Sequence, residues 1–141
     1  MSPVELFYLA FAGVTAAVIA IALIFGRTPE RLSATIFAVA TIISQISSRL
    51  IPHHQLGSAL LLIDGIMSFG FLYLALRYGY LWLALLMLAT AGYFSVHSFY
   101  LAMAMPPDRI FVISSNFATG IALLSLAIGV WTSRHRKDEW R

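Results

Sequence analysis

Two side chains that can carry a proton lie well inside long apolar stretches of this sequence: the carboxylate of Asp64 and the imidazole of His97. A carboxylate among aliphatic neighbours is costly unless it is neutral, paired or hydrated. An imidazole beside it can exchange protons near neutral pH, because the unperturbed pKa of histidine is about 6.5. Asp64 and His97 are therefore the first candidates for a functional site.

A second group of polar side chains lies in the segment TIISQISSRLIPHH, at residues 41–54. Four of them recur at i, i+3, i+4 and i+7, which is the spacing of one helix face. They are Thr41, Ser44, Gln45 and Ser48, with Arg49 beside them. Asn116, in a later apolar stretch, adds a further amide. Such groups either bind a ligand or join one helix to another.

The composition indicates the setting of these side chains. The chain has 141 residues, of which 60% are hydrophobic and 11% charged, and its mean hydropathy is +0.87. Soluble domains carry about 25% charged residues, and a membrane-spanning helix needs about 20 apolar ones. We expect residues 1–133 to form one all-α, antiparallel bundle, because the connections are short. Its five transmembrane helices are predicted at residues 3–25, 29–51, 55–77, 79–105 and 109–133, followed by a basic tail at 134–141.

The distribution of positive charge predicts the orientation of this bundle. Five spans place the two chain ends on opposite sides of the membrane. One side then holds seven of the nine lysines and arginines, and the other holds only Arg49 and Arg109. Because positive residues concentrate on the cytoplasmic side, we expect the N-terminus outside and the tail in the cytoplasm. The expected location is the inner (plasma) membrane of a bacterium.

Helical spacing converts to depth, because each residue rises about 1.5 Å along the axis. On this measure Asp64 lies about 14 Å and His97 about 12 Å from the outer ends of their helices. Gln45 and Asn116 lie roughly 8–10 Å deep. We therefore expect one polar cluster in the outer half of the bundle, formed by the second to fifth helices. Arg49 and His97 are the candidate partners of Asp64.

The predicted cluster has a functional and a structural interpretation. It consists of Asp64, His97, Arg49, Gln45, Asn116, Ser44 and Ser48. Ionisable residues inside membranes commonly mark solute or proton pathways, so we expect the protein to bind or conduct a small solute or a proton. The alternative is a non-catalytic accessory or assembly subunit of a larger membrane complex, in which the cluster only fixes helix packing. A membrane-embedded enzyme is less favoured, because hydrolysis needs a serine, a base and an acid in contact.

A metal site is a weaker interpretation. Imidazoles and thioethers suit copper, and the candidate ligands are His53, His54, His97, Met103 and Met105. Haem ligation would need a second histidine facing His97 at its own depth, and the predicted helices supply none. The sequence also has no cysteine and no glycine-rich phosphate loop, so we expect no cofactor.

The expected partners follow from the same features. The lipid bilayer is the first, and further copies of the chain or other membrane subunits are candidates for the second. Ala12, Ala16 and Ala20 form a small-residue stripe that favours close packing against a neighbouring helix or another subunit. The sequence pI of about 9.6 reflects the loops and the tail, so we do not expect nucleic-acid binding.

Overall fold

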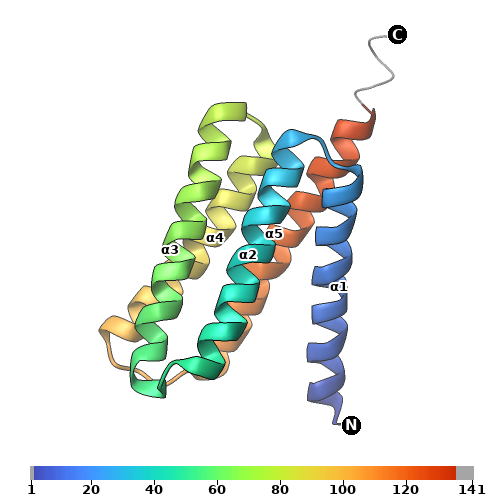
Figure 1. Ribbon diagram of the computed structural model, residues 1–141. Coiled ribbons are helices and arrows are strands. Elements are labelled where there is room, and N and C mark those ends of the chain that lie inside the picture. The colour runs from blue at the N-terminus through green and yellow to red at the C-terminus, as the bar shows by residue number, and fades with distance from the viewer. Residues whose placement is uncertain (1, 136–141) are drawn as a thin grey trace.

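The computed structural model describes residues 2–135, without the side chains of residues 3, 4, 53 and 54, and this part of the chain is all-helical (Figure 1). Consecutive helices run in opposite directions. Each is long and apolar enough to span a membrane, as the sequence predicts. The helices are α1 (Pro3–Phe25), α2 (Thr28–Leu50), α3 (His53–Tyr78), α4 (Leu81–Ala102) and α5 (Arg109–His135).

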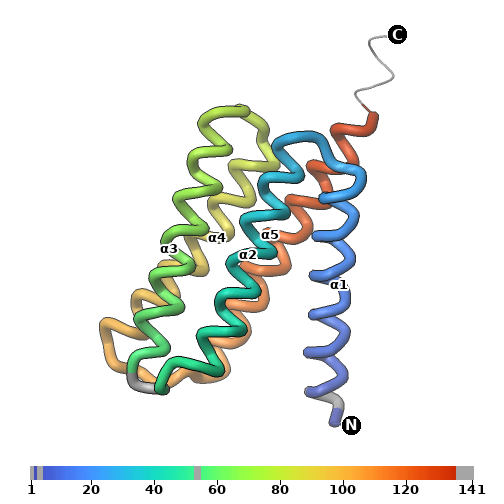
Figure 2. The backbone as a smooth tube through the Cα atoms, in the orientation of Figure 1, coloured from blue at the N-terminus to red at the C-terminus, as the bar shows by residue number. Residues whose placement is uncertain are grey.

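The two ends of the bundle differ in charge. The α1–α2 and α3–α4 connections lie at the same end as the last turns of α5, as the tube in Figure 2 shows. We call this the basic end, and it holds Arg27, Arg31, Arg77 and Arg134. The α2–α3 and α4–α5 connections lie at the opposite end, which holds Arg49 and Arg109.

Gly26 and Glu30 shape the tight connection between α1 and α2. A Cβ atom at Gly26 would lie 2.3 Å from the backbone oxygen of Ala22 and 2.7 Å from the Cβ of Glu30, so only glycine fits. The Glu30 carboxylate accepts a hydrogen bond of 2.9 Å from the backbone N–H of Arg27 and caps the start of α2. At the other connection of this end, Gly79 has a φ of 65°, which ends α3 in the left-handed conformation that glycine favours.

The end of α4 differs most from its predicted limit. The sequence predicts a helix to residue 105, whereas α4 ends at Ala102. Ala104 has a φ of 49°, and the N–H of Met105 donates to the backbone oxygen of Tyr100 at 3.0 Å. The left-handed conformation of Ala104 accounts for this early end, since Pro106 disfavours the helical conformation only at Met105, the residue directly before it. The remaining limits differ from the predicted ones by at most two residues.

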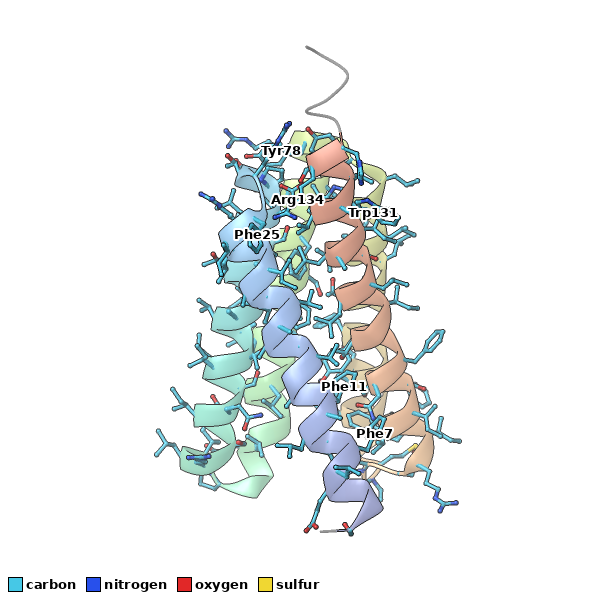
Figure 3. The ribbon with its side chains drawn as sticks, turned by 90° about the vertical axis from the view of Figure 1, so that its right-hand side faces the viewer. Phe7, Phe11, Phe25, Tyr78, Trp131 and Arg134 are labelled. Carbon is cyan, nitrogen blue, oxygen red and sulfur yellow. The ribbon has the colours of Figure 1, made fainter. Side chains whose placement is uncertain are left out.

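The helices form an incomplete ring with one helix outside it. In the order α2, α3, α4, α5, each helix packs against the next, whereas α2 and α5 contact each other only slightly. Within the described residues, α1 packs against α2 and α5 and against neither α3 nor α4. Figure 3 shows α1 crossing obliquely in front of the seam between α2 and α5. Helix α1 is thus more peripheral than the rest, and it covers the open side of the ring.

An apolar core fills the half of the bundle nearer to the basic end. Its large, fully buried side chains include Phe71, Leu83, Leu86 and Leu126. The packing is closest between α4 and α5, where a Cβ atom at Gly129 would lie 2.6 Å from the indole ring of Trp82. This core holds the ring together at one end and leaves the other half to the polar side chains.

The outer surface of the bundle is also apolar. Each helix exposes large hydrophobic side chains, such as Leu9, Ile42, Phe69, Leu88 and Phe117, which are between 57% and 74% exposed. A surface of this kind is unfavourable in water, because its apolar area would remain hydrated. Five apolar helices with outward-facing apolar side chains are compatible with a multi-pass membrane protein.

Candidate binding site

Asp64 of α3 and His97 of α4 contact each other inside the bundle. The Nδ1 atom of His97 lies 2.5 Å from Oδ2 of Asp64, and the two side chains are only 15% and 9% exposed. The two residues meet because they are at similar distances along the chain from Gly79, where α3 turns back into α4. The helices are close at this level, since a Cβ atom at Gly65 would lie 3.3 Å from the Phe94 ring.

Aromatic rings from two helices hold the His97 imidazole in place. Its centroid lies 4.8 Å from that of Tyr93 and 4.9 Å from that of Phe111, and the Phe111 ring is nearly parallel to it, at 21°. With Nδ1 directed at Asp64, these contacts leave the imidazole little freedom to rotate. The arrangement fixes Nδ1 as the nitrogen of His97 that faces the carboxylate.

The connection from α4 to α5 positions Phe111 in turn. Asp108 accepts a hydrogen bond of 2.9 Å from the backbone N–H of Phe111 and another of 2.7 Å from the hydroxyl of Tyr100. The N–H of Phe111, and then the Tyr100 hydroxyl, lower the pKa of the Asp108 carboxyl from its ordinary value. Asp108 therefore caps α5 as an anion, and in doing so it supports the ring that stacks on His97.

Asp64 also forms part of the wall of a cavity inside the ring. The cavity has a volume of about 170 Å³, and helices α2, α3, α4 and α5 all contribute to it. This is space for several water molecules or a small solute. His97 does not line it, so Asp64 separates His97 from the cavity. The polar residues of the wall are Thr41, Ser44, Gln45, Asp64, Thr90, Tyr93 and Thr119.

The threonines of the cavity wall can act only as hydrogen-bond acceptors toward a ligand. The hydroxyls of Thr41, Thr90 and Thr119 each donate to a backbone carbonyl one turn earlier, over 2.8 to 3.1 Å. Their hydrogens are therefore engaged, and only oxygen lone pairs are left for a ligand. Among the described residues, the side chains of Gln45 and Ser44 line the cavity and have no hydrogen-bond partner, so these two groups can donate as well as accept. With the Asp64 carboxylate, the site can accept several hydrogen bonds and one positive charge.

A larger groove lies against this cavity, between α1, α2 and α5. Its volume is about 700 Å³, and α1 contributes Ala12, Ala16 and Ala20, the predicted small-residue stripe. The groove and the cavity have four residues in common: Phe37, Thr41, Gln45 and Thr119. These side chains stand at the seam between α2 and α5, which α1 covers.

The core closes the cavity toward the basic end. Phe37 lines the cavity, its ring centroid is 6.4 Å from that of Phe71, and Phe71 is fully buried. Beyond this core, a separate cavity of about 220 Å³ lies at the basic end and includes Glu30, which is 1% exposed. Sequence reasoning did not single out Glu30 or Tyr93 as site residues. For Glu30, the available signal was its place in the first turn of a helix, which predicts a cap rather than burial.

Besides His97, three residues of the predicted cluster do not line the cavity. Ser48 is exposed and donates a hydrogen bond of 2.8 Å to the backbone oxygen of Gln45. Arg49 is exposed at the end of α2 and forms no ion pair with any residue in the described range 2–135. Asn116 is half-buried on α5 and does not line the cavity. Of the two candidate partners of Asp64, the structure thus has His97 in contact and Arg49 apart from it.

His97, Met103 and Met105, three of the candidate copper ligands, differ in their surroundings. His97 directs Nδ1 at Asp64, and Met103 and Met105 are 60% and 41% exposed after α4. The side chains of His53 and His54 lie outside the described residues. In the described part of the chain, no three histidine or acidic side chains come together as a metal site.

Comparisons with protein-family models, with curated proteins and with solved structures give no match to this chain. The function is therefore inferred from its own residues and their geometry.

Proposed function

We propose that this chain is a multi-pass protein of the inner (plasma) membrane, with the basic end in the cytoplasm. Five helices of sufficient length and the exposed apolar side chains on each of them support insertion. The excess of arginine at the basic end supports the orientation, because positive residues favour the cytoplasmic side. In this orientation the cavity lies in the middle and outer part of the bundle.

We further propose that the protein binds or conducts a small solute or a proton through this cavity. The observation that carries the proposal is the Asp64 side chain, which lines the cavity and contacts His97 through Oδ2. Asp64 is the group that meets the ligand or accepts the proton. His97 is a positioning residue and proton partner, because its ring is held by Tyr93 and Phe111 and does not reach the cavity.

The test is proton flux in vesicles that contain the full chain and an internal pH-sensitive dye. Asp64→Asn removes the charge at nearly constant volume and should reduce the flux to the level of protein-free vesicles. Glu5→Gln is the matched control, because Glu5 is an exposed carboxylate on α1 that only caps its helix. If Asp64→Asn folds normally and carries the same flux as the wild type, a proton role for Asp64 is wrong.

The alternative is an accessory or assembly subunit in which the same contact only joins α3 to α4. The observation that favours it is the direct bond between side chains of two helices, which is the form that a structural link takes. Isolation from native membranes in mild detergent distinguishes the two. A stoichiometric complex with other subunits supports the accessory role, and a stable assembly of this chain alone contradicts it.

A further inference from the structure

The ligand class of the cavity can be inferred from the groove that adjoins it. Phe37, Thr41, Gln45 and Thr119 line both spaces, so a single molecule could place one end in each. The groove is walled mainly by apolar residues of α1 and α2, and its volume of about 700 Å³ is within the range of small-molecule sites, about 300–1,000 Å³. The cavity is smaller, more polar and contains a carboxylate. This combination suits an amphiphile with an apolar chain and a compact polar head.

The acceptors in the cavity determine the chemistry of that head. Asp64 brings a carboxylate, and the hydroxyl hydrogens of Thr41 and Thr119 are already donated to the backbone. Within the described residues, no lysine or arginine lines the cavity, so an anionic head would meet the carboxylate without a compensating charge. A primary ammonium carries one positive charge and three N–H donors, which complement this wall. Phe37 and Tyr93 also line the cavity, and aromatic rings attract a cation placed over their faces.

We propose that the physiological ligand is a single-chain lipophilic amine, with its ammonium group at Asp64 and its apolar chain in the groove beneath α1. This inference rests on the proposed function, because it uses the same Asp64 site. The alkyl chain of the amine passes from the groove to the cavity beside Gln45 and Thr119, which set the width of that passage. The amine enters from the bilayer, since α1 contacts only the two helices that border the seam.

Amine binding and proton binding compete for the same negative charge. The titratable groups that face Asp64 are His97 and Tyr93, both on α4, whereas α2 and α5 bring only uncharged side chains to the cavity. An ammonium ion at the carboxylate takes the place of a proton on the same oxygen atoms, and within the described residues no other charged side chain lines the cavity.

The experiment is the binding of radiolabelled dodecylamine to the full chain in phosphatidylcholine nanodiscs, with protein-free nanodiscs subtracted. Dodecyltrimethylammonium, which has no N–H donor, and dodecanol, which has no charge, are the competitors. We expect unlabelled dodecylamine to displace the label at concentrations about tenfold lower than those that either analogue requires. A tenfold difference corresponds to the contribution of one charge-assisted hydrogen bond. Equal displacement by all three would overturn the proposal, because the head group would then not be recognised.

Variants locate the bound amine. Ala16→Leu fills the groove and should weaken binding about tenfold, whereas Ala17→Leu, at the next position of the same helix but outside the lining of the groove, should leave it unchanged. Asp64→Asn should abolish saturable binding, and Gln45→Leu should weaken it if Asp64→Asn does not fold. If Ala16→Leu and Ala17→Leu bind alike, the groove is not the site. If amine binding is absent while proton flux still requires Asp64, this inference fails and the proposed function stands; loss of neither activity in Asp64→Asn overturns both.

Discussion

The contact between Gly129 and Trp82 gives a sharp prediction about how α4 and α5 close the bundle. A Cβ atom at Gly129 would lie 2.6, 2.7 and 2.9 Å from three carbons of the indole ring, and the indole is 6% exposed in the core. Gly129→Ala must therefore move either the ring or the helix. Gly120 lies on the same helix, and a Cβ atom there would meet no other side chain within 4 Å, so Gly120→Ala is the matched control.

The magnitude follows from two opposing effects. Overpacking of a filled core costs about 1–3 kcal/mol. Replacing glycine by alanine inside a helix stabilises the folded state by roughly 0.5–1 kcal/mol, because the unfolded chain loses backbone entropy. We expect Gly129→Ala to destabilise the protein by about 1–2 kcal/mol, and Gly120→Ala to stabilise it by roughly 0.5–1 kcal/mol. The two variants carry the same chemical change, so the difference between them isolates the packing against Trp82.

The measurement is reversible unfolding by sodium dodecyl sulfate in mild detergent, followed by far-ultraviolet circular dichroism. This signal is preferable to tryptophan fluorescence, because Trp82 itself is expected to move. A Gly129→Ala protein that is as stable as Gly120→Ala would refute the close packing of Trp82 on α5. It would also contradict the inference that this contact closes the half of the bundle nearer to the basic end.

Three further predictions concern the loop, the topology and the core. For Asp108, whose pKa is lowered in the folded state, the stabilisation is present above the ordinary carboxyl pKa and lost as the pH falls through the folded value. Thermal unfolding over a pH series should thus show Asp108→Asn less stable than the wild type at neutral pH, with the difference vanishing in strong acid. Since the chain has no cysteine, His54→Cys and Lys137→Cys should label from opposite sides of the membrane, and labelling from one side would contradict five spans. Phe71→Ala should raise passive proton leak in vesicles by opening the core below the cavity, whereas Phe69→Ala, 74% exposed on the same helix, should not.

The number of helices and most of their limits could be predicted from the sequence because they depend on local features. Long apolar runs, capping residues such as Asp108 and breakers such as Pro106 act within a few residues of their own position. The end of α4 was predicted too late, because the left-handed turn at Ala104 has no glycine to mark it. A turn made by an ordinary residue leaves no signal in composition.

The candidate site was only partly predictable, for a geometric reason. Depth along a helix can be counted from the sequence, and this placed Asp64 and His97 at similar levels. The direction of a side chain around the helix axis depends on which neighbour the helix packs against. Counting alone could therefore not separate Gln45, which lines the cavity, from Asn116, which does not. The groove depends on α1 crossing the seam, and that crossing follows from tertiary packing that no local pattern encodes.

The position of the core favours binding with entry from one side over an open channel. Phe71, Leu86 and Leu126 occupy the half nearer to the basic end, and Phe37 seals the cavity against them. A solute at Asp64 could therefore exchange with the half of the bundle away from the basic end, or with the groove, without crossing this core. Passage to the basic end would require Phe37 and Phe71 to separate, which exposes apolar surface and is costly. Any transport through this fold therefore requires the Phe37 and Phe71 rings, which come from α2 and α3, to move apart.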